Sequence, residues 1–413
     1  MAPSPHDDSP QERARRHLDG GTPAEAVSLL RAMVDAGDTR ITVVHDLIRA
    51  HLAAGDQPAA LTLMQRLATA VPDRADIQLQ FAGLLHHDGR VDDALAVCVA
   101  AARRCPDDVD VWRSIDRRAS QTGRHRMAFD ACRRVCALAP REVASWRRLG
   151  ITARRARENA VADEAIDRWY ELDPTDPTAA HLHAAHHGGR PDRADPRYVA
   201  ALFDSYADGF DEHLGKLGYR TPEAVAALVA RLLEGADGAG AGVGAVIAAD
   251  LGCGTGQVGV HLRALVGHLV GVDLSAGMLA KAHQRGCYDR LEQAELTEFL
   301  VQHPATFRLL TSADTLNYIG DLHPVFVAAA TALLPGGHLV FSLEAGEREP
   351  DDGYRLEPSG RYAHSPEWTR RALATAGFAE VSVEGSVLRR EGDVDVAGLL
   401  FVARLPGTGN SPG

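Results

Sequence analysis

The chain shows two patterns of hydrophobic and polar positions, and the first gives way to the second near residue 198. In the first part apolar residues recur at the spacing of a helix face, for example Trp112 with Ile115 and, farther on, Trp146 with Leu149. In the second part helical stretches alternate with short apolar runs that have strand character. The pattern therefore predicts a multidomain chain, an all-α region followed by an α/β region.

The all-α region repeats itself every 34 residues. In four copies a glycine is followed five positions later by an alanine: Gly21 and Ala26, Gly55 and Ala60, Gly89 and Ala94, Gly123 and Ala128. A proline follows twelve positions later in three of these copies: Pro72, Pro106 and Pro140. A fifth copy keeps Ala162 and Pro174 but has Arg157 where the glycine would stand, and the first copy has Asp38 in place of the proline. The period predicts a helix, a tight turn, a closely packed second helix and a connection that begins at proline.

This pattern resembles the tetratricopeptide repeat. The resemblance implies a solenoid of about five repeats over residues 7–186, with PTAAHLHAAHHG as its capping helix. Residues 1–6 are expected to be a disordered N-terminus, and the Gly- and Pro-containing stretch 187–197 to be a linker. A solenoid presents a concave surface and no chemistry of its own, so its expected role is to bind a partner or to form a homodimer.

Residues 103–157 are strongly basic, with 15 Arg against 6 Asp and Glu, although the whole chain has a formal net charge of −12. A solvated helix face accounts for most charge runs of this kind. The alternative is a groove that docks an acidic peptide or a C-terminus, because guanidinium groups pair well with carboxylates. The net charge argues against a general nucleic-acid binder.

Strands and helices alternate through residues 198–405. The runs with strand character are AVIAADLG, LVGVDLS, RLEQAELT, TFRLLTSAD, GHLVFSLE, FAEVSVEGS and DVAGLLFVARL. Helical stretches such as AGMLAKAHQRG and HPVFVAAATALLPGG lie between them, except before the last run. This order predicts a parallel, doubly wound sheet that closes with an antiparallel hairpin. Residues 406–413 are expected to be a disordered tail.

The first of these runs continues into AADLGCGTGQVGV, which fits two glycine motifs. One is a GxGxxG ending at Gly259, typical of dinucleotide binding, and the other is a GxGxG starting at Gly252, two residues after Asp250. Both bring the backbone close to a ligand and expect an acid after the second strand, here Asp273. The acid before the loop, Glu295 after the third strand and PGG before the fifth favour the second motif.

Together these features resemble class I S-adenosylmethionine-dependent methyltransferases. The stretches LFDSYADGFDEHLGKLGYRTP, LEPSGRYAHS, LTEFL and LLFVAR resemble bacterial members that carry tetratricopeptide repeats ahead of the catalytic domain. The resemblance implies a Rossmann-like domain with a seven-stranded sheet over 198–405, a lid helix at its start, S-adenosylmethionine as cofactor, and Gly259 as a helix-packing glycine. A composition rich in Ala, Arg and Gly, with lysine only at positions 216 and 281, is also typical of high-GC bacteria.

The expected cofactor residues follow from this resemblance. The glycine loop would wrap the methionine moiety, with Asp250 directed to its amino group or to the loop amides. Asp273 would bind the ribose diol, and Glu295 the adenine amino group. The full set expected around S-adenosylmethionine is Asp250, Gly252, Gly254, Gly256, Asp273, Leu274, Met278, Glu295, Leu296, Ser312 and Tyr206.

Residues after the fourth strand, and in the insertion after the fifth, are expected near the methyl acceptor. His364 is the leading general-base candidate, because an unperturbed histidine titrates near neutrality, and a structural role is its alternative. Asp314 and Tyr318 are further catalytic candidates. Arg355 and Arg361 would pair with a carboxylate of the acceptor. The expected acceptor-binding set is Arg355, Arg361, Tyr362, Asn317 and His213, and no metal is expected.

The expected function is methyl transfer to an O or N nucleophile of a peptide or protein recruited by the repeats. Two alternatives stay open: methylation of a small anionic metabolite or natural-product intermediate, with the repeats serving self-association, and a non-catalytic adaptor that only binds S-adenosylmethionine. The six cysteines form no CxxC pair, the N-terminus has no apolar run, and no stretch of 18 apolar residues occurs. We therefore expect a cytoplasmic protein without membrane or nucleic-acid partners.

Overall fold

The computed structural model describes residues 9–235, 246–345, 353–391 and 394–407. The chain divides into two compact units, Met1–Asp173 and Pro174–Gly413. The expected disordered residues 1–6, and the expected tail from residue 408 onward, lie outside the described residues. Within the described ranges, every helix is too short or too polar to cross a membrane.

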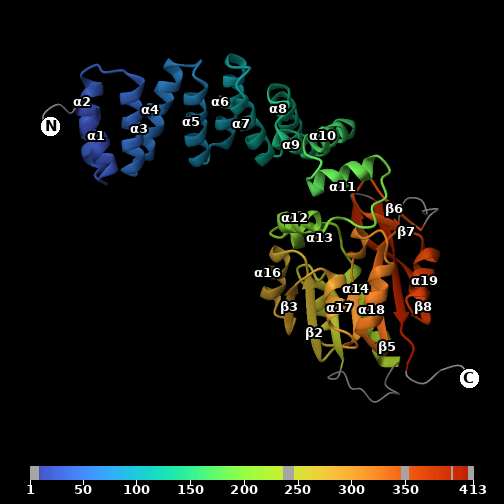
Figure 1. Cartoon of the computed structure of the whole chain (residues 1–413). Coiled ribbons are helices and arrows are strands. Elements are labelled where there is room, and N and C mark those ends of the chain that lie inside the picture. The colour runs from blue at the N-terminus through green and yellow to red at the C-terminus, as the bar shows by residue number, and fades with distance from the viewer. Residues whose placement is uncertain (1–8, 236–245, 346–352, 392–393, 408–413) are drawn as a thin grey trace, which may run out of the picture. The chain divides into compact units, whose positions relative to one another are not determined.

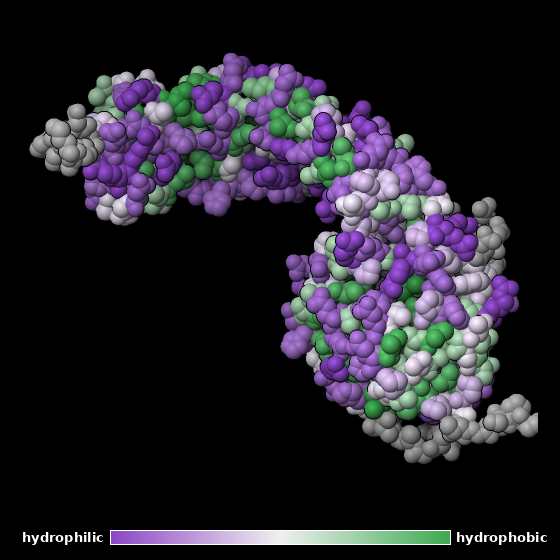
Figure 2. Space-filling model, viewed as in Figure 1, coloured by the Kyte–Doolittle hydropathy of each residue, from purple (hydrophilic) through white to green (hydrophobic). Residues whose placement is uncertain are grey.

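The first unit, called the helical unit below, contains five pairs of helices among the residues described. They are α1 (Pro10–Asp19), α2 (Pro23–Asp35), α3 (Ile41–Ala53), α4 (Gln57–Ala70), α5 (Ala75–His87), α6 (Val91–Arg104), α7 (Val109–Gln121), α8 (His125–Leu138), α9 (Val143–Arg155) and α10 (Asn159–Leu172). Each packs chiefly on its neighbours in sequence, and Figure 1 shows them following one another in chain order. The surface seen in Figure 2 is mainly hydrophilic. The predicted all-α region is confirmed.

The 34-residue period has a direct structural cause. The turn inside each of the first four pairs contains a glycine with φ between 70° and 79°: Gly21, Gly55, Gly89 and Gly123. The fifth pair keeps this left-handed turn without glycine, since Arg157 has φ 62°. The alanines five positions after these turns are at most 1% exposed, so the paired helices approach closely there: Ala26, Ala60, Ala94, Ala128 and Ala162. The predicted roles of the repeated glycine and alanine are therefore confirmed.

The second unit, called the sheet unit below, is built on a seven-stranded sheet of order β3-β2-β1-β4-β5-β9-β8. Its strands are β1 (Ile247–Leu251), β2 (His268–Asp273), β3 (Arg290–Gln293), β4 (Phe307–Ser312), β5 (Leu333–Glu344), β8 (Glu380–Glu391) and β9 (Val394–Arg404). Strands β1 to β5 pair in parallel, whereas β9 is antiparallel to both β5 and β8. The predicted parallel sheet with a closing antiparallel hairpin is confirmed.

Helices pack on both faces of this sheet. The helices of the sheet unit, in chain order, are α11 (Pro177–His186), α12 (Pro196–Tyr206), α13 (Phe210–Lys216), α14 (Thr221–Gly235), α15 (Gln257–Leu262), α16 (Ala276–Arg285), α17 (Leu296–Gln302), the short 3₁₀ helix η3 (Leu316–Tyr318), α18 (His323–Ala332) and α19 (Pro366–Thr375). One core holds α14, α15 and strand residues such as Leu309, whereas the other holds α17, α18, α19 and Leu310. Successive strand residues point to opposite faces, so both cores share the same strands.

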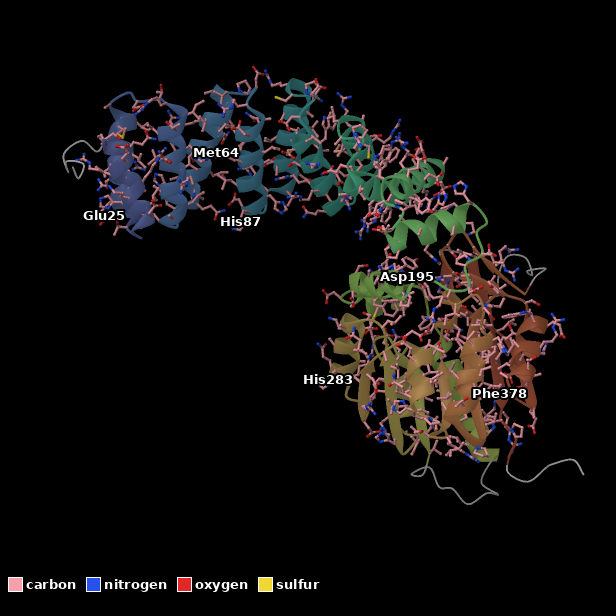
Figure 3. The ribbon with its side chains drawn as sticks, viewed as in Figure 1. Glu25, Met64, His87, Asp195, His283 and Phe378 are labelled. Atoms are coloured by element: carbon pink, nitrogen blue, oxygen red, sulfur yellow. The ribbon has the colours of Figure 1, made fainter. Side chains whose placement is uncertain are left out.

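Several elements differ from the expectation. The predicted lid helix breaks into α12 and α13 around Gly209, and Asp195, labelled in Figure 3, begins α12 by accepting the N–H of Arg197 at 2.8 Å. The stretch LTEFL forms most of α17, although it was not predicted as a helix. The insertion after β5 forms a hairpin of β6 (Tyr354–Leu356) and β7 (Tyr362–His364). Finally α11, expected to cap the repeats, belongs to the sheet unit.

Candidate functional site

The loop after β1 turns back on itself through three left-handed glycines. Gly252, Gly254 and Gly256 have φ of 69°, 54° and 89°. A Cβ at Gly252 would overlap the side chain of Thr315, whereas at Gly254 it would meet nothing within 4 Å. The loop therefore needs glycine for its conformation, and it leaves open space beside the Gly254 backbone that a ligand can approach.

Asp273, at the end of β2, holds this loop in place. Its Oδ2 accepts the N–H of Gly254 at 2.9 Å, and its Oδ1 accepts the N–H of Ser275 at 2.8 Å. Burial raises the pKa of the Asp273 carboxyl, and the backbone amides of Ser275, Gly254 and Leu274 oppose this rise. A carboxylate has about four acceptor positions. The acceptor capacity that remains suits the hydroxyl groups of a ribose diol.

Asp250 lies inside the sheet, 1% exposed. Its carboxylate accepts the hydroxyl of Tyr288 at 2.7 Å and that of Thr311 at 3.0 Å, so these bonds go to the core and not to the loop amides. Burial raises the pKa of Asp250 to about 6. The ring of Tyr288 also packs against Gly259, where a Cβ would overlap it, which confirms Gly259 as a packing glycine. Sequence reasoning missed both hydroxyl partners.

Glu295 and Leu296 lie together where β3 gives way to α17. The Glu295 carboxylate caps this helix by accepting the N–H groups of Thr297 at 2.9 Å and Glu298 at 3.0 Å. It also pairs with Arg193 at 2.7 Å, a residue of the stretch predicted as a linker. Leu296 is the first residue of α17, where backbone amides have no carbonyl partner within the helix. Its N–H is therefore a donor suited to a ring nitrogen of adenine.

The other expected cofactor residues have varied surroundings. Leu274 is half-buried beside Asp273, as expected of a residue that covers a cofactor ring. Met278 and Ser312 are fully buried, and Ser312 Oγ donates to the Leu251 carbonyl at 3.0 Å. Tyr206 is 53% exposed. The structure therefore gathers the glycine loop, Asp273 and Leu274 at one edge, and it does not bring Tyr206 into that group.

Asp211, in α13, ties the lid region to the glycine loop. Its Oδ1 accepts the hydroxyl of Thr255 at 2.6 Å and the side-chain amide of Gln257 at 2.9 Å. Its Oδ2 pairs with Arg285 at 2.6 Å, and the same guanidinium donates to the Thr255 carbonyl at 2.6 Å. One lid carboxylate thus fixes the loop and the end of α16 together.

Two other lid carboxylates bind α16. Asp204 accepts the Ser275 hydroxyl at 2.5 Å and the Gly277 N–H at 3.0 Å, and these bonds lower its pKa. Asp208 pairs with Lys281 at 2.9 Å. Asp204 and Asp208 were not predicted as functional residues, although their four-residue spacing in DSYAD already indicates one helix face.

Asp314, directly after β4, is a strained residue with φ 53°. Its Oδ1 accepts the Ser342 hydroxyl at 2.7 Å, and its Oδ2 accepts the Thr221 hydroxyl at 3.2 Å. The buried hydroxyl of Tyr219 bonds to the same carboxylate, and burial followed by the Asp314 charge raises the Tyr219 pKa well above its usual value. Left-handed non-glycine residues cost free energy and concentrate at functional sites. The expected catalytic candidate Asp314 therefore lies among hydroxyl groups at the carboxyl edge of the sheet.

The carboxylate of Glu344, at the end of β5, forms ion pairs with two guanidinium groups. Arg361 lies 3.0 Å and Arg389 2.9 Å from the same carboxylate oxygen. Asn317 accepts the Glu344 N–H at 2.9 Å through its side-chain oxygen. Arg389 is 6% exposed and was missed by sequence reasoning, because it comes from β8, far along the chain. Arg361 and Asn317, two expected acceptor residues, are thus brought together.

His364 is 4% exposed, with Nε2 lying 2.9 Å from the Ile319 carbonyl and 3.0 Å from that of Gly320. Burial lowers the pKa of His364 to about 4. Its Nδ1 is buried without a hydrogen-bond partner among the described residues. A buried, neutral ring that donates to backbone carbonyls is poorly placed as a general base. Its surroundings fit the structural alternative instead.

The other three expected acceptor residues and the catalytic candidate Tyr318 are dispersed. Tyr362 is 1% exposed and donates to a backbone carbonyl at 3.0 Å. Arg355 forms an ion pair within its own hairpin, and His213 is exposed on α13. Tyr318 packs edge-on against Phe203 of the lid, with ring centroids 5.4 Å apart. Tyr318 therefore contacts the lid, and His213 belongs to it.

Comparison with known proteins places this geometry in context. A family profile described as "Methyltransferase domain" matches residues 248–337. The human protein "Methyltransferase-like protein 27" is 30% identical over 210 residues, which are 48% of this chain and 80% of that protein. The "Ubiquinone biosynthesis O-methyltransferase" of Aromatoleum aromaticum is 32% identical over 97 residues, so this chain spans 42% of that relative's length. A solved "S-adenosylmethionine dependent methyltransferase from Mesorhizobium loti" is 26% identical, with a TM-score of 0.33, over 41% of this chain and 96% of that chain.

Proposed function

Because the chain belongs to the methyltransferase-domain family and is an S-adenosylmethionine-dependent methyltransferase, we propose that it methylates an O or N nucleophile of a peptide or protein recruited by its helical unit. We propose that this unit is a tetratricopeptide-repeat array. The observation that carries the proposal is the series of five similar helix pairs ahead of the sheet unit. Arrays of this kind present extended surfaces on which partners bind. A bacterial source and a cytoplasmic location belong to the same proposal.

The residues at the carboxyl edge of the sheet fit S-adenosylmethionine by their donor and acceptor chemistry. Asp273 offers acceptor capacity for the ribose diol, whereas a bond from the adenine amino group to Glu295 would replace one of the four that this carboxylate accepts from Thr297, Glu298 and Arg193. The Leu296 amide is a donor for an adenine ring nitrogen, and the open backbone at Gly254 gives room for the methionine part. When bound, the cofactor supplies an electrophilic methyl group on its sulfonium sulfur.

The chain's own residues act on the acceptor by orientation. A direct displacement needs the nucleophile in line with the departing thioether, and orientation alone lowers such barriers greatly. Asp314, with its three hydroxyl partners, is the group proposed to position a protonated nucleophile and accept its proton. Because Asp211 holds α13 on the glycine loop and Asp204 holds α12 on the start of α16, we propose that the lid excludes water from this region.

Methylation of a small anionic metabolite is a second candidate, with the helical unit serving homodimer formation. Arg361 and Arg389 favour it, because both guanidinium groups converge on the Glu344 carboxylate near the same edge. Relatives named for phosphoethanolamine and malonyl-[acyl-carrier protein] methylation also favour it. A free carboxylate or phosphate on the acceptor would compete with Glu344 for these guanidinium groups.

One labelling experiment distinguishes the two candidate functions. The full chain is incubated with methyl-tritiated S-adenosylmethionine and cell extract, and acid-precipitable protein is then separated from soluble small molecules. We expect label in the protein fraction, and loss of that label in Asp273→Ala. Label confined to small molecules would support the metabolite candidate, and an absence of enzyme-dependent label in both fractions would contradict both. Release of the label by mild base would identify a methyl ester.

A further inference from the structure

A cavity of about 550 Å³ lies within the helical unit, between the first helices of its fourth and fifth pairs. Helix α7 contributes Arg113 and Arg117 to its lining, and helix α9 contributes Arg148 and Arg155. Val135 of α8 adds an apolar surface. The cavity has the volume of a ligand pocket, which typically measures roughly 300–1,000 Å³. It contains none of the residues of the methyl-transfer site.

Two of the four arginines are held by acids of the opposite helix. Arg148 bonds both oxygens of Asp116 at 2.7 Å, and Arg113 bonds both oxygens of Glu142 at 2.6 Å. Hydrogen bonds to these carboxylates raise the pKa values of both arginines, so they stay charged. These two pairs link α7 to α9 and fix the shape of the cavity.

The other two arginines keep their charges unmatched. Arg117 and Arg155 are exposed, and neither forms a hydrogen bond or ion pair with the residues that the structure describes. The cavity lining therefore carries four guanidinium groups against two carboxylates, in a chain whose formal net charge is −12. A planar guanidinium without a partner is a ready site for bidentate pairing with a carboxylate.

We propose that this cavity binds an acidic peptide segment in which carboxylate side chains alternate with uncharged residues. Arg117 and Arg155 pair with the peptide carboxylates, and the side-chain amide of Gln121, also in the lining, bonds its backbone. The two acids that line the cavity repel a uniformly charged polyanion, so a nucleic acid fits it less well. This inference rests on the proposed function, because it names the class of partner that the helical unit is proposed to recruit.

The test measures binding to the full chain without cofactor, by fluorescence anisotropy at low salt. The probe is the fluorescein-labelled peptide (Glu-Gly)6, and its matched control is (Gln-Gly)6. We expect the acidic peptide to bind at least about tenfold more tightly, and the difference to shrink as salt rises. The double variant Arg117→Gln with Arg155→Gln should weaken the acidic peptide by about tenfold or more. The matched double variant Arg66→Gln with Arg103→Gln removes two exposed arginines outside the cavity and should bind as the unaltered chain does.

Three results would overturn the proposal. The first is equal affinity for the two peptides, and the second is undiminished binding by Arg117→Gln with Arg155→Gln. The third is tighter binding of a (dT)12 oligonucleotide than of (Glu-Gly)6, which would assign the cavity to nucleic acid. Because no methyl transfer occurs in this assay, its outcome is separate from that of the labelling experiment.

Discussion

The carboxylates Asp250 and Asp273 lie at the ends of neighbouring parallel strands and have different partners. Asp273 accepts two backbone amides at the open edge of the sheet, whereas Asp250 accepts two hydroxyls inside it. The hydrogen bonds from backbone amides to Asp273 fix the shape of the loop. The hydrogen bonds from hydroxyls satisfy the buried carboxyl of Asp250, whose pKa is raised by burial to about 6. At the scale of single residues, the carboxyl edge of the sheet therefore depends on Asp273 for the shape of the glycine loop and on Asp250 for the packing behind it.

Replacement of Asp273 by alanine is expected to weaken S-adenosylmethionine binding by about a hundredfold, from the loss of charged hydrogen bonds to the diol and of the acceptor that holds Gly254. Isothermal titration with the full chain measures this change. Asp289→Ala is the matched control, because Asp289 also accepts a backbone amide, that of Leu269 at 2.7 Å, but at the opposite end of β2. Equal affinities of the two variants would contradict the assignment of Asp273.

His364 predicts a pH dependence of stability. Its pKa is lowered to about 4 in the folded chain by burial, against about 6.5 in an unfolded chain. Between these values the unfolded state binds the extra proton, so the unfolding free energy of the sheet unit falls as pH decreases from about 6.5 to about 4, by up to ~3 kcal/mol. Urea unfolding read by pulse proteolysis, at several pH values, measures it.

The variant His364→Gln isolates this effect. The stability advantage of the unaltered chain over His364→Gln should shrink on acidification, whereas His213→Gln, which removes an exposed histidine, should follow the unaltered chain. A difference between the unaltered chain and His364→Gln that stays constant from pH 7 to pH 4 would show that His364 is not the buried, neutral group described here.

At the scale of elements, strands and helices can be predicted from the sequence where a segment is long enough to show a hydrophobic period. The prediction fails where the structure depends on a contact with a residue distant in the sequence. The seven strands and most helices follow from their own apolar patterns. Helix α17 has only seven residues, too few for a helical period to be recognised, and it depends on the Glu295 cap. Arg389 reaches Glu344 from the last hairpin, and its guanidinium could be placed only once the strand order was known.

The same reasoning applies to the site. The glycines and Asp273 could be predicted from their spacing along the chain, because the turn between a strand and a helix is a local structure. The general-base assignment of His364 rested on residue type alone. The burial of the His364 side chain argues against that assignment. This burial depends on how the hairpin β6–β7 packs on the segment around Ile319.

The lid provides a prediction at this scale. Asp211→Asn weakens three bonds that join α13 to the glycine loop and to Arg285, so the lid should open more readily. We expect S-adenosylmethionine to dissociate about tenfold faster, from a loss of roughly 1.4 kcal/mol in lid closure. Stopped-flow displacement with S-adenosylhomocysteine measures the rate. Glu212→Gln, next in sequence and paired only with Lys216 among the described residues, is the control and should leave the rate unchanged.

The repeat turns give a second prediction for elements. Arg157 adopts a left-handed conformation that glycine adopts in the other four pairs, at a cost of roughly 1–2 kcal/mol for a residue with a Cβ. Arg157→Gly should therefore stabilise the helical unit by about 1 kcal/mol, and Gly123→Ala should destabilise it by a similar amount. Urea unfolding followed by the fluorescence of the tryptophans measures both, and equal signs for the two changes would contradict the shared turn conformation.

At the scale of the whole molecule, the two units have separate hydrophobic cores. Four clusters of buried residues belong to the helical unit, around Leu47, Met64, Ala94 and Phe129, and three belong to the sheet unit. Residues proposed to bind S-adenosylmethionine lie in the sheet unit, and the arginine-lined cavity lies in the helical unit. A ligand stabilises only the cooperative block whose folded state binds it.

Two ligands are therefore expected to protect two different parts of the chain. S-adenosylmethionine at a hundredfold excess over its dissociation constant should add about 2.7 kcal/mol to the unfolding free energy of the sheet unit. Hydrogen exchange read by mass spectrometry would then slow in peptides from 174–413 and stay unchanged in those from 9–173. The ligand (Glu-Gly)6 should slow hydrogen exchange only in the proteolytic fragments from α7 to α9.

Variants separate the two effects. Asp273→Ala should abolish the protection by S-adenosylmethionine and keep the protection by (Glu-Gly)6. Arg117→Gln with Arg155→Gln should abolish the protection by (Glu-Gly)6 and keep the protection by S-adenosylmethionine. If either ligand slowed exchange equally in both units, unfolding would be a single cooperative event and the separation of binding roles would be wrong.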